Sequence, residues 1–278
     1  MLLHTAPTVI YLCTMTQPFD PMTAPQPVEV PLAEAPLIRV VAQVRFPKSL
    51  AIEQHETASR FQKTVQDAYP VLREEQLQGF VIDKAGAQPA AHQKIWRFSD
   101  VDAGWTLSLA PDFLALETTR YTNRAAFLAR LRSAVEALAT HVGPKLVDRV
   151  GLRYIDRIEG SAIEDITRMV RAELRGVVGT PAGAHVTHAL TEALFTADGE
   201  QLRARWALLP PNATHDPSAV KPVPETSWVL DLDMFRAGPV PFSTDQLVID
   251  AERFAARVYT FFRWAVTDDF LRRYGGTL

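Results

Sequence analysis

Cysteine is almost absent from this sequence of 278 residues, which contains only Cys13. One cysteine excludes an intramolecular disulfide and any zinc site built from several thiolates. A chain of this length can bury a sufficient core without disulfides or a metal. Because disulfides are rare in reducing compartments, we expect a cytoplasmic protein.

Positive charge is not in excess, since the formal net charge is −3 at pH 7. The chain therefore has no global attraction to nucleic acid or to an anionic membrane, and any anion site has to be local. No apolar run reaches the roughly 18 residues that a membrane span requires, so we expect no membrane partner.

Signature motifs of common enzymes are missing as well. The sequence has no GxxxxGK phosphate loop, no GxSxG nucleophile motif and no HExxH zinc motif. His185 and His188 are three residues apart in an expected strand, which places them on opposite faces and argues against a shared metal. We expect no metal and no cofactor, and a non-enzymatic role is favoured over an enzymatic one.

Proline, in contrast, is concentrated near the N-terminus, where residues 17–36 contain six prolines. This density disfavours both helices and central strands, so we expect residues 1–36 to be a disordered leader. Met1 to Met15 has no Lys or Arg before its apolar part and therefore lacks the positive region of a secretory signal. The true start could be Met1, Met15 or Met22.

The stretch RVGLRYIDRI at residues 149–158 predicts the central strand of the fold. Successive strand residues point to opposite faces. One face of this strand therefore carries apolar side chains (Val150, Leu152, Tyr154, Ile158), and the other carries Arg149, Arg153 and Arg157. Asp156 interrupts the apolar face.

The first half, residues 37–146, alternates between strand and helix patterns. Apolar residues alternate along 38–46, with Arg39 and Arg45 on the other face, which predicts a strand. Helical spacing predicts a helix over residues 52–72 and a second helix after Asn123, a favourable N-cap. Between the helices we expect strands at 80–84 and 95–99, and a hairpin of 105–110 with 113–121 around Pro111 and Asp112.

The second half, residues 147–278, repeats this order of elements. Ser161 and Glu164 form a capping-box pattern that predicts a helix reaching Val177. Strands are expected at 185–196, 202–209 and 228–234, and residues 210–224 form a long loop with five prolines. Ser243 and Gln246 then begin a long amphipathic C-terminal helix.

These patterns predict an α+β fold with one or two mainly antiparallel sheets and helices on one face. In both halves the predicted order of elements is strand, helix, several strands, helix. One interpretation is a tandem duplication, in which residues 37–146 and 147–278 together form one compact unit. The alternative is a single irregular α+β domain.

Three segments together resemble a sporadically distributed family of bacterial proteins with no established activity. They are PLIRVVAQVRF at 36–46, LETTRY at 116–121 and RVGLRYIDRI at 149–158. The resemblance covers residues 37–274 and implies a bacterial or phage origin and an accessory gene. It implies no site residues, because that family has no assigned catalytic residues.

The arginine-bearing strand face is the candidate ligand site. A basic surface of Arg149, Arg153 and Arg157 beside Arg39 and Arg45 could hold a phosphate or a carboxylate, with Glu117 and Tyr121 pointing to the same face. Alternatively, Arg153 or Arg157 pairs with Glu117 and only stabilises the sheet. Asp231 and Asp233 could bind a cation, but pairs with Arg203 and Arg205 of the adjacent strand explain them better.

These observations favour a binding or regulatory protein that holds a small or peptide-like ligand on a strand face or between the halves. An enzyme that uses Arg153, Glu117 and Tyr121 on an anionic small molecule is one alternative. Nucleic-acid binding along the arginine face is another. The partner is therefore an unknown anion or protein, and a homodimer stays open.

Overall fold

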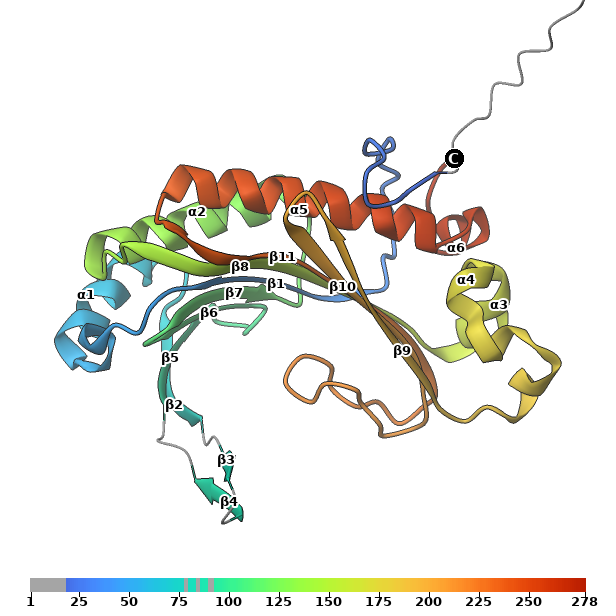
Figure 1. Cartoon of the computed structure of the whole chain (residues 1–278), viewed down its shortest axis with the longest axis horizontal. Coiled ribbons are helices and arrows are strands. Elements are labelled where there is room, and N and C mark those ends of the chain that lie inside the picture. The colour runs from blue at the N-terminus through green and yellow to red at the C-terminus, as the bar shows by residue number, and fades with distance from the viewer. Residues whose placement is uncertain (1–18, 78–79, 84–85, 90–92) are drawn as a thin grey trace, which may run out of the picture.

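The computed structural model describes residues 19–77, 80–83, 86–89 and 93–278. The chain has an α+β fold, as expected, with a nine-stranded sheet in which all pairs are antiparallel. Long helices cover one face of this sheet (Figure 1). Among the described residues, no helix has the length and apolarity to cross a membrane.

The first half supplies five strands of the sheet. Its elements are β1 (Leu37–Arg45), η1 (Leu50–Glu53), α1 (His55–Val65), β2 (Val71–Leu77), β3 (Phe80–Asp83), β4 (Gly86–Pro89), β5 (Gln93–Ser99), β6 (Trp105–Ala110), β7 (Phe113–Thr118) and α2 (Arg124–His141). β3 and β4 pair only with each other and form a separate two-stranded sheet.

The second half supplies the other four strands. Its elements are β8 (Leu146–Ile158), η2 (Gly160–Asp165), α3 (Ile166–Met169), α4 (Ala172–Arg175), η3 (Gly176–Gly179), η4 (Pro181–His185), β9 (Ala189–Ala197), β10 (Glu200–Leu209), β11 (Ser227–Pro241), α5 (Thr244–Ala265) and α6 (Asp268–Arg273).

β8 is an interior strand of the sheet, as its sequence pattern indicates, but the middle strand of the nine is its neighbour β1 and not β8 itself. The strand order is β2-β5-β6-β7-β1-β8-β11-β10-β9, so β8 pairs with β1 on one side and with β11 on the other. Val44 faces Val150 and Ala42 faces Leu152 in the β1–β8 register. This one sheet runs through both halves of the sequence.

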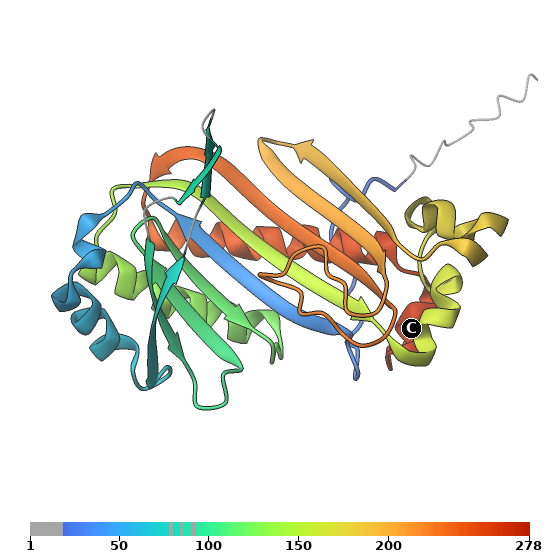
Figure 2. The same ribbon diagram turned by 90° about the horizontal axis from the view of Figure 1, so that it is seen from below.

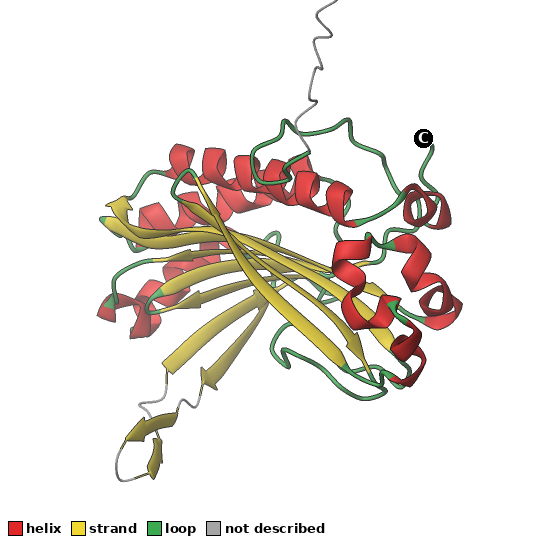
Figure 3. Cartoon of the chain, turned by 45° about the vertical axis from the view of Figure 1, so that its right-hand side comes forward, coloured by secondary structure: helices red, strands yellow, loops and turns green. Residues whose placement is uncertain are grey.

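The helices α2 and α5 lie side by side on one face of the sheet (Figures 1 and 3). Phe127 and Leu131 of α2, and Phe254 and Phe261 of α5, are buried in the main core. They pack against the apolar faces of the strands, which include Val40, Val150, Leu152 and Leu232. No long helix of the described segments covers the opposite face of the sheet (Figure 2), and we call it the open face.

Two helix starts and one hairpin follow their sequence signals. The Asn123 side chain accepts a hydrogen bond from the Ala126 N–H at 2.8 Å, and the Ser243 side chain accepts one from the Gln246 N–H at 3.3 Å. These caps satisfy N–H groups that a helix terminus leaves free. Ala110 faces Phe113 across the predicted turn at Pro111 and Asp112.

The predicted helix over residues 161–177 is wrong. The chain instead forms short 3-10 and α segments, and Ser161 caps no helix. Val170 is extended and forms an isolated antiparallel bridge with Val266. Of the apolar residues at helical spacing, Ile166, Val170 and Leu174 are buried as expected, whereas Val177 is 48% exposed. The bridge at Val170 breaks the predicted helix in its middle. The helix predicted over 52–72 also ends early, at Val65, and residues 71–77 form β2.

Residues 19–36 differ from the expected disordered leader, because they dock on the helices as an extended strap. Met22 is buried in the main core, and Val30 and Leu32 pack against that core. The Arg257 guanidinium donates to the carbonyls of Pro21 and Ala24 at 3.1 and 2.8 Å. The density of prolines correctly argued against helices and strands in residues 19–36. It does not prevent an extended chain from packing on the core. Residues 1–18 of the predicted leader lie outside the described residues.

Candidate functional site on the open face

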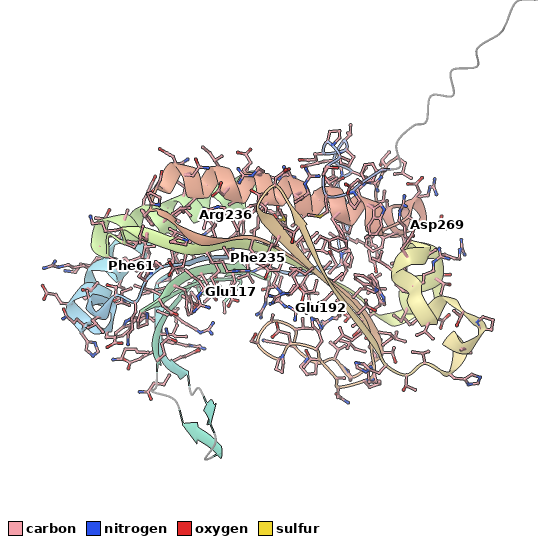
Figure 4. All side chains as sticks on the ribbon, viewed as in Figure 1. Phe61, Glu117, Glu192, Phe235, Arg236 and Asp269 are labelled. Carbon is pink, nitrogen blue, oxygen red and sulfur yellow. The ribbon has the colours of Figure 1, made fainter. Side chains whose placement is uncertain are left out.

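The open face is built by the strand residues that alternate with the buried apolar ones. Figure 4 shows Glu117 and Glu192 on the side of the sheet away from α5, whereas Arg236 lies towards α5, where it pairs with Asp250. In the strand register, Glu117, Val41, Arg153, Asp233 and Arg203 follow one another across five neighbouring strands. Charges of both signs therefore alternate across this face.

All five arginines of the predicted ligand site form ion pairs. Arg45 pairs with Asp112 at 2.6 Å, Arg39 with Glu117 at 3.5 Å, and Arg157 with Glu159 at 2.9 Å. Arg149 donates to both carboxylate oxygens of Asp233, at 3.0 and 2.8 Å. Arg153 pairs with Asp231 at 2.7 Å and with Asp216 at 2.8 Å.

Asp231 is the most enclosed charge of the open face, with 0% of its side chain exposed. Arg153 donates to both of its carboxylate oxygens at 2.7 Å. Arg205 lies 3.1 Å from Oδ2, and His215 Nε2 lies 2.9 Å from the same oxygen. Several donors thus compensate one buried carboxylate, as a buried charge requires.

Hydrogen-bond donors lower the pKa values of both Asp216 and Asp231. Burial alone would raise the pKa of Asp216, but hydrogen bonds from Ser218 and Arg153 outweigh it and lower the pKa to about 2. For Asp231, burial is again the largest effect, and hydrogen bonds from Arg153 and His215 outweigh it and lower its pKa. Both side chains are therefore carboxylates at neutral pH.

Three arginines of β1 and β8 hold the loop of residues 210–226 against the open face, and we call them the arginine clamp. Arg39 donates to the Ser218 carbonyl at 3.0 Å, and Arg157 donates to the Lys221 carbonyl at 2.8 Å. Arg153 reaches the Asp216 carboxylate of the same loop. Figure 2 shows this loop lying across the sheet on the face away from the helices.

The clamped loop is also ordered by its own hydrogen bonds. The Asp216 carboxylate accepts from the N–H and the hydroxyl of Ser218, at 3.1 and 2.6 Å. Asn212 donates from its backbone to Val223 at 2.7 Å. Beneath the loop, Ala219 and Val220 pack on a small apolar cluster with Ile155 and Val229. The loop is therefore part of the folded structure.

A second group of contacts surrounds Phe235 on the same face. The Arg149 guanidinium lies 4.4 Å from the centre of the Phe235 ring, and that of Arg203 lies 5.9 Å from it. Gly151 makes room for this arrangement, because a Cβ there would lie 2.6 Å from the Arg149 guanidinium. Arg203 forms no ion pair with any described residue.

Glu117 and Tyr121 do not meet Arg153, contrary to the predicted grouping. Glu117 lies on the open face, but Val41 of β1 stands between it and Arg153 in the register. Its partners are Arg39 and Arg97, each at 3.5 Å. Tyr121 packs on the helix side, where its hydroxyl lies 3.5 Å from that of Tyr154. The predicted group of Arg153, Glu117 and Tyr121 is therefore not assembled.

The predicted pairing of Asp231 and Asp233 with Arg203 and Arg205 holds only for Arg205 and Asp231. Asp233 is bound by Arg149 of β8 instead. The sequence pattern shows which residues share a face, but both strands beside β11 carry arginines, and the periodicity does not show which of them pairs with each aspartate.

His215 and Asp216 are site residues that the sequence analysis missed, because a loop has no periodic pattern. The Asp-x-Ser turn at 216–218 was the available signal.

Asp156 is a second buried acid, on the helix face of β8 between Leu37 and Leu230 of the neighbouring strands. It forms no hydrogen bond or ion pair with the described residues, and burial raises its pKa to about 7. Its interruption of the apolar pattern was visible in the sequence.

Within the described ranges, no group of three or more His, Cys, Asp or Glu side chains could hold a metal ion. Two pockets of about 160 and 280 Å³ lie around Val178 and Trp228, on the helix side of the sheet. The open face is thus a surface of paired charges.

No protein-family model and no curated protein matches this chain. The resemblance to a sporadically distributed bacterial family, with the origin that it implies, stays a prediction.

Proposed function

We propose that this protein is a non-enzymatic binding protein, and that its open face holds an extended segment of a partner that carries both acidic and basic side chains. The observation that carries the proposal is the alternation of charges across the strands, from Glu117 through Arg153 and Asp233 to Arg203. A partner of mixed charge can match such a pattern, because complementary charges set its register and orientation.

The open face contains two kinds of ion pair, which differ in their exposure to solvent. The Asp231 pairs are enclosed, so breaking them leaves a buried charge and is costly. The pairs of Glu117 with Arg39 and Arg97 are partly exposed, with 24% of the Glu117 side chain accessible. Exposed pairs contribute about 0–1 kcal/mol and can exchange partners at little cost. This region, beside the clamped loop, is the proposed contact surface.

The geometry favours a macromolecular segment over a small ligand. Small-molecule sites are usually clefts of about 300–1,000 Å³ that bury most of the ligand. The two pockets noted above in the described residues are smaller than this and lie on the helix side. A free anion is disfavoured because each predicted arginine already has a carboxylate partner. The same argument disfavours nucleic acid.

The test is selection of displayed random peptides on the immobilised protein. Peptides with both acidic and basic residues should be enriched, and Gln43→Trp should abolish their binding, because Gln43 lies in the middle of the open face on β1. Gln62→Trp on α1 is the matched control, with similar partial exposure but away from this face. Equal loss in both variants, or selective binding of phosphate or oligonucleotides, would contradict the proposal.

We also infer that the two halves derive from a duplicated unit. The supporting arrangement is the antiparallel pair β1–β8 in the middle of the sheet, flanked by β7-β6-β5-β2 on one side and by β11-β10-β9 on the other. In each half a long helix follows the strand beside the central pair, α2 after β7 and α5 after β11.

A further inference from the structure

The edge of the sheet at β9 differs from the opposite edge. β2 carries Arg73, Glu74 and Glu75, and charges of this kind protect an edge from pairing with other chains. β9, with the sequence ALTEALFTA, has nine residues, no proline and a single charge, Glu192. In the described residues its outer backbone edge has no strand partner, and this free ladder of N–H and C=O groups is a template for another strand.

Apolar side chains line this unprotected edge. Leu194 is 55% exposed and Leu190 is 48% exposed. Leu194 stands opposite Arg203 and Glu192 opposite Arg205, so these β9 side chains lie on the open face. Phe195 points to the other side, where its ring packs on Phe261 at 5.2 Å. β9 is therefore firmly attached to the core while its outer edge stays free.

We propose that β9 is the interface through which a second copy of this chain binds, by antiparallel pairing of β9 with its counterpart. When two identical strands pair antiparallel about a two-fold axis, directly opposed residues lie on the same face of the sheet. Each possible register is therefore symmetric about one residue, which stands opposite its own copy at the axis. A register centred on Leu194 places the two Leu194 side chains together at the axis. The open face of the sheet would then continue into the partner copy.

Charge and side-chain pairing favour this register. With Leu194 at the axis, Glu192 stands opposite Thr196 of the other copy, and Ala193 stands opposite Phe195. The glutamates are well separated, whereas a register centred on Glu192 would oppose them directly, which is destabilising. The Leu194 register thus buries the most exposed leucine of β9 without apposing like charges.

A shallow pocket of about 280 Å³ adjoins the start of β9 and fits the same arrangement. Val177, Ala189, Thr191 and Trp206 are among its lining residues, and Val177 is 48% exposed. In the Leu194 register Thr191 stands opposite Ala197, so the β9–β10 turn of the second copy reaches this pocket. The contact therefore extends beyond the strand ladder onto additional apolar surface.

The experiment measures the mass of the full chain in solution by sedimentation over a concentration series. We expect a dimer for the unmodified protein. Leu194→Lys should raise the dissociation constant about a hundredfold or more, because two leucines lose their burial and two ammonium groups meet at the axis. Leu190→Lys is the matched control: it lies on the same face of β9 but opposes residue 198, so it should remain dimeric.

Two further variants test the register. An equimolar mixture of Leu194→Lys and Leu194→Glu should form a heterodimer, because opposite charges then meet at the axis. Leu194→Cys in a Cys13→Ser background should cross-link to a dimer on mild oxidation, and Leu190→Cys should not. If the unmodified protein is a monomer in solution, the proposal is wrong, even when that monomer binds a strand-forming peptide. A dimer insensitive to Leu194→Lys overturns it as well.

Discussion

Asp156 is the residue whose environment fits its charge least. It is buried on the helix face of β8, and burial raises its pKa from 3.8 to about 7. Between these pH values the folded protein keeps a proton that the unfolded chain has lost. The free energy of unfolding therefore falls as the pH rises through this window and is constant above it.

Asp156→Asn should accordingly stabilise the protein at alkaline pH. The gain is at most about 4 kcal/mol, since the pKa differs by about three units and each unit corresponds to roughly 1.4 kcal/mol. Near pH 4 Asp156 is neutral in the folded protein and about half protonated in the unfolded chain, so the difference should nearly vanish. Urea unfolding of both proteins at about pH 4 and pH 8 measures this; equal stability at the higher pH would show that Asp156 has a partner or solvent access.

Residue-level predictions from sequence succeeded where periodicity determines the outcome. The alternating pattern of residues 149–158 placed Arg153 on one face and Leu152 in the core, and both are found there. Periodicity could not identify the partner of Arg153, because Asp216 lies in a loop and Asp231 on a strand distant in sequence. Partner choice depends on tertiary contacts that no local pattern contains.

Among the elements, the N-terminal strap is the largest departure from expectation. Its contacts are Met22 in the core, the Arg257 hydrogen bonds to Pro21 and Ala24, and the Tyr259 hydroxyl, which accepts from the Val30 N–H at 2.7 Å. None of these requires a helix or strand, so the sequence offered no periodic signal for them. The breaks in the predicted 161–177 helix likewise arise from a tertiary contact, the Val170–Val266 bridge.

A variant that begins at Ala35 should be less stable than the full chain. Loss of the Met22 burial and the strap hydrogen bonds should lower the free energy of unfolding by about 3 kcal/mol. Met22→Ala should reproduce part of this loss, by about 2 kcal/mol. Thermal unfolding of the three proteins compares them, and an unchanged midpoint in the shortened variant would mean that the strap is not held by these contacts.

At the scale of the whole molecule, the fold separates a helix-covered core from an open face of paired charges. The α+β fold class and the interior position of β8 were predictable, because long amphipathic patterns and strand alternation are strong signals. The clamped loop was not, because its position depends on three arginines from two strands that meet only in the assembled sheet. The arginine clamp gives the arginines of the open face a structural role, because Arg39, Arg153 and Arg157 hold the loop of residues 210–226 against the sheet.

Hydrogen exchange of the loop amides in Arg153→Met tests most directly whether the arginine clamp holds the loop. The Val220 and Asn212 N–H groups bond within the loop at 2.8 and 2.7 Å. They should lose protection when Arg153 no longer holds Asp216, while Arg149→Met, whose arginine contacts Asp233 and not the loop, should leave them protected. Arg153→Met should also lower the free energy of unfolding by about 3 kcal/mol, because Asp231 loses its bidentate partner. Unchanged loop protection in Arg153→Met, with stabilisation by phosphate only in the unmodified protein, would contradict the clamp and make Arg153 an anion-binding residue.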